Sequence, residues 1–322
     1  MKAFSRRAFV MGASSLAAAA TARSRPALAA DTVRMGYIGD FNGASLAAIA
    51  ADQDLWAAHG LAPDLKVFTN GPIQIQAFGS ASLDFGYVGP GALWLPASGR
   101  AKVIAINNLG QADRVIAQAG FKSVVDLKGK KVGVPEGTSG DMLLRLALQR
   151  AGMTVDDIEY IRMDPSTVVA AFASRQIDAA GIWYPLVAVI KDRVPDLVEI
   201  AANADFFPQI AFPTAFVSRN DVADDLVRKV IAVLKGANAF RAAHLDKAVA
   251  ITANFIGIGA DKLAEEAQHS KFLTTPELEA ATTDGTAAGW LATLNGMFKT
   301  FGRLPDPLDP KAYFRADLYA ES

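Results

Sequence analysis

Short apolar runs alternate with amphipathic stretches over most of the chain. Runs rich in Val, Ile, Phe and Tyr predict strands at 33–38, 65–68, 84–88, 102–107, 114–117, 132–134, 158–161, 179–182 and 197–200. Apolar positions at helical spacing predict helices between them, including one from about 44 to 59, and a mainly helical chain after about 221. This alternation predicts an α/β fold with open, mainly parallel sheets that carry helices on both faces.

The segment GVPEGTSGDMLLRLALQRAG (133–152) reads as a strand end, a loop rich in Gly, Ser and Thr, and a helix. Thr138 or Ser139 can cap the helix, and Gly152 is expected to follow its end. A phosphate-binding P-loop would have Lys after Gly140, where this chain has Asp141. The first N–H groups of a helix carry partial positive charge, so an anion could dock here without a cationic side chain. An ordinary capped turn explains the same pattern.

Three further turns, at 40–43, 70–72 and 89–91, also contain Gly and precede predicted helix starts. Ligands of open α/β sheets bind outside the carboxyl ends of the strands. The chain shows no recognisable catalytic motif beside these turns. We therefore expect a binding site built largely from backbone N–H groups.

The composition narrows the partners and the chemistry. The chain has 32 Lys and Arg and 33 Asp and Glu; five of the basic residues and none of the acidic ones fall in the first 30 positions. The remainder is therefore acidic, which argues against a nucleic-acid partner. No Cys is present, which excludes disulfides and thiolate chemistry. The three scattered His have no metal-ligand spacing, so neither a metal nor a cofactor is expected; His59 is interpreted as a helix-end residue, and His244 and His269 as surface residues.

Residues 1–30 have the pattern of a secretory signal peptide, with a basic start, an apolar stretch at 8–20 and the small-residue tripeptide ALA at 27–29. The segment SRRAFV (5–10) resembles the twin-arginine signal, and a general secretory signal with a chance Arg pair is the alternative. No later apolar run is long enough to span a bilayer. We expect a soluble periplasmic protein that is exported by the twin-arginine machinery.

Four segments resemble the nitrate, sulfonate and taurine group of ABC-transporter substrate-binding proteins. They are SLDFGYVGPGAL (82–93), SVVDLKGKKVGVPEGTSGDMLL (123–144), VVAAFASRQIDAAGIWYP (168–185) and FVSRNDVADD (216–225). The resemblance implies a two-lobed periplasmic binding protein fold of type II, with one lobe at 31–115 plus 216–322 and the other at 116–215. Two strand crossings near 114–117 and 214–217 would form the hinge. It also implies a protein that is not an enzyme and that passes a small anionic organic solute, sulfonate-like, or an oxyanion to a membrane permease.

The same resemblance implies solute-binding residues from both lobes: Phe41, Asn42, Asn70, Gly71, Gly89, Pro90, Thr138, Ser139, Gly140, Trp183 and Tyr184. We expect the 138–140 turn to hold the anionic end of the solute. Many relatives have Asp where this chain has Tyr184, and a carboxylate there is well placed to pair with an ammonium group. Its loss argues against an aminosulfonate such as taurine, unless Glu136, Asp141 or Asp40 replaces it. Nitrate, a carboxylate or a neutral heterocycle also fits the expected pocket.

Two other classes of function are the alternatives: an enzyme on the same fold and a ligand-presenting sensory protein. A thiamine-pyrimidine-synthase-like enzyme would need specific His and Cys residues, and this chain has no Cys. A serine hydrolase would need Gly-x-Ser-x-Gly, which the turn around Ser139 does not match. A ligand-presenting sensory protein would normally be joined to a membrane helix or a DNA-binding domain, and the sequence shows neither; a free binding protein can also present its ligand to a sensor, so this alternative stays open.

Overall fold

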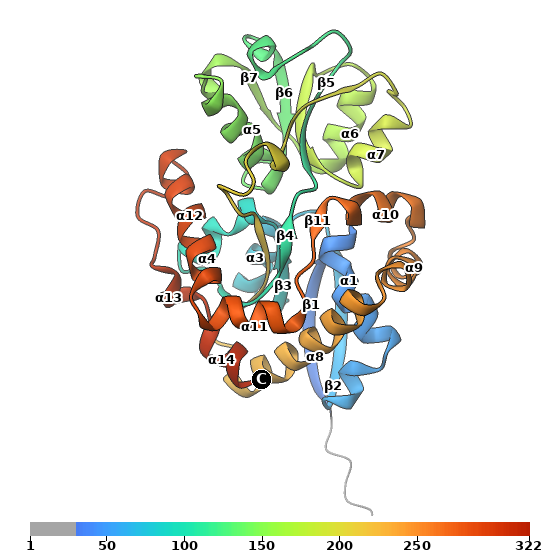
Figure 1. The fold of residues 1–322 in the computed structure, drawn as a ribbon, viewed down its shortest axis with the longest axis vertical. Coiled ribbons are helices and arrows are strands. Elements are labelled where there is room, and N and C mark those ends of the chain that lie inside the picture. The colour runs from blue at the N-terminus through green and yellow to red at the C-terminus, as the bar shows by residue number, and fades with distance from the viewer. Residues whose placement is uncertain (1–29) are drawn as a thin grey trace, which may run out of the picture.

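A computed structural model describes residues 30–322, which form two α/β lobes joined by two passages of the chain (Figure 1). The predicted signal peptide lies outside the described residues except for Ala30. Each lobe is built on one open sheet, and the strand orders are β11-β4-β10-β3-β1-β2 and β7-β6-β8-β5-β9. No helix in the described part is long and apolar enough to cross a membrane.

The first lobe combines the two ends of the described chain. Its strands are β1 (Asp31–Ile38), β2 (Leu61–Phe68), β3 (Phe85–Val88), β4 (Lys102–Gly110), β10 (Pro213–Ser218) and β11 (Ser270–Lys271). Its helices are α1 (Phe41–Asp52), α2 (Leu55–Ala58), α3 (Gly71–Gly79), the 3-10 turn η1 (Pro90–Ala92), α4 (Trp94–Ala97), α8 (Asp224–Ala243), α9 (Leu245–Ile256), α10 (Ala260–Gln268), α11 (Thr275–Thr283), α12 (Thr286–Thr300), α13 (Pro310–Tyr313) and α14 (Ala316–Glu321).

The second lobe is the segment between the two passages. Its strands are β5 (Asp113–Ala117), β6 (Lys131–Val134), β7 (Glu159–Arg162), β8 (Ala179–Trp183) and β9 (Val198–Ala202). Its helices are α5 (Ser139–Arg150), α6 (Pro165–Ala173) and α7 (Leu186–Lys191), with 3-10 turns η2 (Val124–Leu127), η3 (Val155–Asp157) and η4 (Asn203–Asp205).

In each sheet most strands point in the same direction, as the alternation of strands and helices predicts, although five of the nine neighbouring strand pairs are antiparallel. β1 pairs in parallel with β2 and β3, and β6 pairs in parallel with β7 and β8. The exceptions are β11, which pairs antiparallel with β4, and the two strands next to the passages. β10 runs antiparallel between β3 and β4, and β5 runs antiparallel between β8 and β9. The predicted fold class is therefore confirmed.

The two passages correct the predicted positions of the crossings. The chain leaves β4 at Gly110 and enters β5 at Asp113, and it returns between Ala202 and Pro213. The segments 114–117 and 214–217 instead lie inside β5 and β10, where their buried residues pack within one lobe. The hinge role of the passages and the lobe limits inferred from the sequence stay predictions.

The predicted helix at 44–59 is divided into α1 and α2. Asp54 has a left-handed backbone conformation with φ of 53°, which separates the two helices. α1 also starts earlier than predicted, because the Asp40 carboxylate accepts a hydrogen bond of 2.6 Å from the Gly43 N–H and caps the helix. His59 lies at the end of α2, as predicted.

Asp84 connects three strands at the edge of the first sheet that lies away from the passages. It accepts hydrogen bonds from Arg34 Nε at 2.8 Å and from Arg219 Nη2 at 3.0 Å, and Arg34 Nη1 also donates to the Ala81 carbonyl at 2.6 Å. Arg34 belongs to β1, Asp84 precedes β3, and Arg219 follows β10. This nearly buried carboxylate therefore anchors strands that are far apart in the sequence.

Replacing Asp84 by Ala should lower the free energy of unfolding by about 1–3 kcal/mol, because two guanidinium groups lose their shared acceptor. Urea titration followed by circular dichroism measures this change. Asp64→Ala is the matched control, since its ion pair with Lys66 is about half exposed on both sides. The control should change stability by less than about 0.5 kcal/mol, and equal losses in the two variants would contradict the anchoring role.

Candidate functional site

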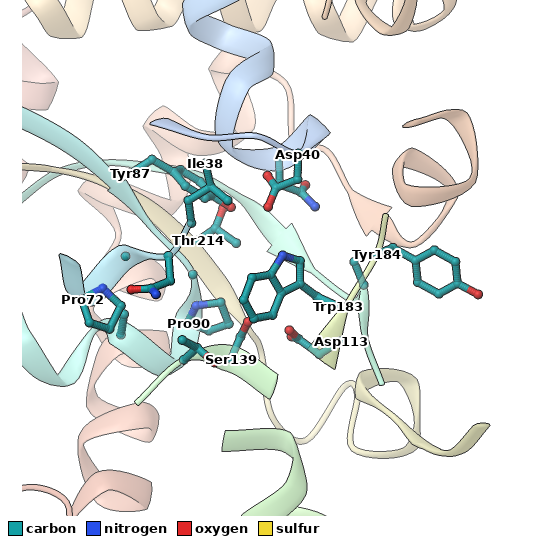
Figure 2. Close-up of a pocket in the computed structure, with 18 residues that line it drawn as sticks. Ile38, Asp40, Pro72, Tyr87, Pro90, Asp113, Ser139, Trp183, Tyr184 and Thr214 are labelled. Atoms are coloured by element: carbon teal, nitrogen blue, oxygen red, sulfur yellow. The ribbon is translucent and has the colours of Figure 1, made fainter. Parts of the chain in front are cut away.

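A small cavity lies between the lobes, at the carboxyl ends of their parallel strands (Figure 2). The first lobe contributes the ends of β1 and β4, the starts of α1 and α3, and the turn after β3. The second lobe contributes the starts of β5 and α5 and the end of β8. Because β10 is antiparallel to its neighbours, its first residues also reach this edge, and Thr214 lines the cavity.

Most of the predicted site residues line this cavity: Asn42, Asn70, Gly71, Gly89, Pro90, Thr138, Ser139, Trp183 and Tyr184. Phe41 and Gly140 are not among the lining residues. The Phe41 ring is fully buried and packs edge-on against Phe272, with ring centroids 5.6 Å apart. Gly140 lies against β8, where a Cβ atom would come within 2.6 Å of the Gly181 carbonyl oxygen. Solute binding by the lining residues stays a prediction.

The two aromatic residues at the end of β8 point in different directions. The Trp183 indole lines the cavity, whereas the Tyr184 ring points away from it (Figure 2). The Tyr184 hydroxyl donates a hydrogen bond of 2.8 Å to Glu199 and accepts one from Lys191. The second aromatic wall is Tyr87 on β3, which the sequence analysis did not select. Tyr87 follows a buried Phe85 at strand spacing, so alternation along β3 did not distinguish it from a core residue.

Asp40 and Asp113 are the only charged side chains among the lining residues, and both are acidic. Their exposed fractions are 5% and 4%. The sequence analysis named Asp40 only as a substitute for the missing carboxylate, and it did not select Asp113. Asp113 opens β5 and stands opposite Trp183 in the pairing with β8, a neighbour that no local pattern reveals.

Burial shifts the pKa of each of these carboxyl groups upward. It raises the pKa of Asp40 to about 7, against hydrogen bonds from Gly43 and Trp183, and the charge of Asp113 adds to the increase. Burial also raises the pKa of Asp113 to about 6, opposed by hydrogen bonds from Ser139 and Asn203 and by the Arg114 charge. Both groups therefore titrate near neutral pH.

A third carboxyl group, Glu266 on α10, lies behind Asp40 and holds the start of α1. It accepts hydrogen bonds from the Phe41 N–H at 2.7 Å, the Asn42 N–H at 3.0 Å and the Asn42 amide at 2.7 Å. Burial raises its pKa well above the usual value, and the Asp40 charge acts in the same direction. The first N–H groups of α1 are therefore already hydrogen-bonded to side chains of the protein itself.

Of the two other helix starts at the cavity, that of α3 is capped by a side chain and that of α5 is not. The Asn70 side chain accepts a hydrogen bond from the Ile73 N–H at 3.1 Å and caps α3. Thr138 is in the N-cap position of α5, but its hydroxyl donates to the Pro135 carbonyl at 2.6 Å instead of capping the helix. Gly152 has a left-handed conformation directly after α5, as expected. An anion at 138–140 would therefore not receive the Thr138 hydroxyl without a rearrangement.

His269 corrects a sequence interpretation. It is half-buried, and its ring lies 4.8 Å from that of Tyr184 on the other lobe. Burial and the Arg114 charge lower its pKa. Such a contact between residues 85 positions apart on different lobes cannot be read from local sequence, which is why His269 was interpreted as a surface residue.

Comparisons with known proteins agree with this architecture. The NMT1/THI5-like family model matches residues 45–248. A protein of Brucella abortus (strain 2308), named as a binding protein without a stated solute, is 59% identical over 290 residues and covers 89% of this chain and 91% of its own length. The taurine-binding periplasmic protein of Escherichia coli (strain K12) is 25% identical over 193 residues, with coverage of 58% and 59%.

Solved structures show the same fold at low sequence identity. The aliphatic sulphonate binding protein SsuA of Escherichia coli superimposes with a TM-score of 0.69 at 21% identity, covering 90% of this chain and 99% of that one. The desulfurization enzyme DszB reaches 0.66 at 14% identity, with coverage of 90% and 98%. The fold is thus shared by a binding protein and an enzyme, whereas the named relatives by sequence are binding proteins. The resemblance seen in the sequence is therefore confirmed: the chain belongs to the NMT1/THI5-like family, and its relatives include periplasmic binding proteins of the taurine and sulfonate type.

Proposed function

We propose that this protein is the periplasmic solute-binding component of an ABC importer, and that it delivers a small solute to a membrane permease. The observation that carries the proposal is a cavity between the lobes to which both contribute nearly buried polar side chains. Asn42 and Asn70 come from the first lobe, and Asp113 and Thr138 come from the second. The names of the taurine- and sulfonate-binding relatives support a solute that carries a sulfonate group.

The size of the cavity supports a small solute. About 40 Å³ is open to the centres of water-sized spheres. One such sphere needs about 10–15 Å³ by this measure, so a solute of a few heavy atoms fits and a polymer does not. The lining residues offer no Ser–His or Cys–His pair, because neither Cys nor His is among them and Ser139 is hydrogen-bonded to a carboxyl group rather than to a His base.

Contacts across the cavity indicate that the lobes are closed. Arg303 of the first lobe lies 3.2 Å from both Glu136 and Asp141 of the second. On the opposite side, Lys262 on α10 forms an ion pair with Asp192 after α7. These contacts must separate before a solute can enter, so loading requires an opening motion of the kind that hinged binding proteins use.

Gly91 lies where the two lobes approach each other closely. A Cβ atom at Gly91 would lie 2.6 Å from the Ser139 backbone nitrogen and closer still to the Thr138 carbonyl group. Gly91 lies in η1 of the first lobe, and its own backbone does not need a left-handed conformation. A methyl group at this position should therefore obstruct closure without disturbing either lobe.

Replacing Gly91 by Ala should leave the melting temperature near that of the parent but prevent compaction by the solute. The solute is the one that co-purifies with the protein from its host, identified by native mass spectrometry. Small-angle scattering should show a smaller radius of gyration for the parent with solute and no change for the variant. Affinity should fall by about tenfold or more, which corresponds to about 1.4 kcal/mol. Gly79→Ala, where a Cβ atom meets nothing within 4 Å, is the control; compaction of both variants would refute closure at Gly91.

We also propose export by the twin-arginine route, on the basis of the SRRAFV segment, which lies outside the described residues. Replacing both Arg6 and Arg7 by Lys should abolish export, because that route depends on the Arg pair. Cell fractionation and immunoblotting measure the periplasmic fraction. Replacing Arg23 and Arg25 by Lys provides a control with the same number of conservative changes. Undiminished export of the first variant would assign the signal to the general secretory route.

A further inference from the structure

We infer that the solute presents a positively charged nitrogen with N–H groups, which binds between Asp40 and Asp113. The inference rests on the proposed function, since it assigns the chemistry of a solute held in the same cavity. It leaves the rest of the solute open. An aminosulfonate satisfies it as well as a simple amine does, whereas an anion without a cationic nitrogen does not.

The charge balance around the cavity is the first argument. Asp40 and Asp113 line it, Glu266 lies directly behind Asp40, and no Lys, Arg or His is among the lining residues. Burying ionised carboxylates without a cation is costly. The Arg114 guanidinium acts on Asp113, but it donates its hydrogen bonds to Glu199 at 2.6 Å and to backbone carbonyls at 2.7 Å. A cationic solute would supply the missing charge.

The second argument is that N–H groups at the helix starts already donate hydrogen bonds to side chains of the protein. The N–H groups that could cradle an anion at α1 donate to Glu266 and Asp40, and the Ile73 N–H of α3 donates to Asn70. At the start of α5, the Gly137 N–H donates to Asp141 at 2.9 Å. The starts of α1 and α3 are therefore largely used by the protein itself, whereas no side chain caps the first N–H groups of α5.

The aromatic walls are the third argument. Trp183 stands opposite Asp113 in the strand pairing, and its indole lies toward Asp40 (Figure 2). Tyr87 lines the cavity on the side of the first lobe. An ammonium group beside an aromatic face gains a cation–π interaction. Carboxylate acceptors beside aromatic faces suit a protonated amine better than a sulfonate or nitrate.

The protonation of Asp40 and Asp113 predicts the direction in which the affinity for the solute changes with pH. A cation binds the ionised carboxylates, so its affinity should rise as the pH increases through 6 to 7, where Asp40 and Asp113 titrate. An anion would need the protonated groups as donors, so its affinity should fall over the same range. Glu266, Tyr87 and Arg114 are the other titratable or charged groups that act on the pair.

The charged side chains at the start of α5 are paired with other groups of the protein. Asp141 is paired with Arg145 at 2.8 Å and with Arg303 at 3.2 Å. The pH dependence of binding is therefore expected to follow Asp40 and Asp113, with Glu266 coupled to Asp40.

The empty protein should show the cost of the buried charge in its stability. An acid whose pKa is higher in the folded than in the unfolded state loses stability as the pH rises through the interval between the two values. For Asp113 this interval runs from 3.8 to about 6. As the pH rises from 4 to 6, the melting temperature of the solute-free parent should therefore fall relative to that of Asp113→Asn. Asp156→Asn, at an exposed position of the same lobe, is the control and should behave like the parent. An unchanged pH dependence in Asp113→Asn would contradict the burial cost.

Methylammonium and methanesulfonate provide matched probes, since each places one charged group on a methyl. Calorimetric titration of the solute-free mature protein at pH 8 should show saturable methylammonium binding in the millimolar range, with little binding of methanesulfonate. Methylammonium affinity should fall by at least about tenfold between pH 8 and pH 5, as the pair takes up protons. Asp40→Asn and Asp113→Asn should each weaken it by about tenfold, whereas Asp64→Asn and Asp156→Asn should not; melting curves verify that all variants fold.

Three results would overturn the inference: no saturable methylammonium binding, tighter binding of methanesulfonate than of methylammonium, or an affinity for methylammonium that rises as the pH falls. None of these decides the importer role, because compaction by the co-purified solute tests that role separately. If the co-purified solute compacts the parent but lacks a cationic nitrogen, the inference fails and the importer role stands. If the protein does not compact with any solute, the importer role itself is contradicted.

Discussion

The bonds between Glu266 and the start of α1 are the interaction on which the candidate site depends. They join α10 to α1 across 225 positions of the sequence and fix the direction of Asn42. Asn42 is bonded in turn to Asn107 and Asn108 of β4, and Asn107 donates to Thr214 of β10 at 3.2 Å. Each buried donor left unpaired would cost about 1–3 kcal/mol. This network therefore gives the cavity a rigid floor that belongs to one lobe alone.

The sequence predicted the order of strands and helices well, because buried strands of a sheet covered on both faces read as short apolar runs. The prediction failed at the passages between the lobes, because the strands next to them are apolar too. β5 and β10 are as apolar as their neighbours, so the passages between lobes could not be distinguished from strand interiors. The break between α1 and α2 also escaped, because the left-handed residue there is Asp54 and not Gly.

The sequence indicated where the candidate site lies in the fold, but it did not reveal that the site is acidic. Gly-containing turns at strand ends correctly indicated where the lobes meet, as most of the predicted residues line the cavity. The direction of the Tyr184 ring and the presence of Asp113 depend on the pairing of β5 with β8, and Glu266 is distant in sequence from everything it contacts. Local patterns describe where a backbone turns, whereas the acidity of this cavity arises from segments that meet only in the folded molecule.

The position of β10 in the middle of the first sheet has a consequence for biosynthesis. Its place lies between β3 and β4, yet it follows the entire second lobe in the chain. Until it is synthesised, β3 and β4 have no partner on their facing edges, and such open edges invite pairing with other chains. The second lobe is one continuous segment and can fold before β10 is synthesised, whereas the sheet of the first lobe cannot be completed until then. The twin-arginine route proposed above would export the chain only after β10 has taken its place in the first sheet, because substrates of that route are exported already folded.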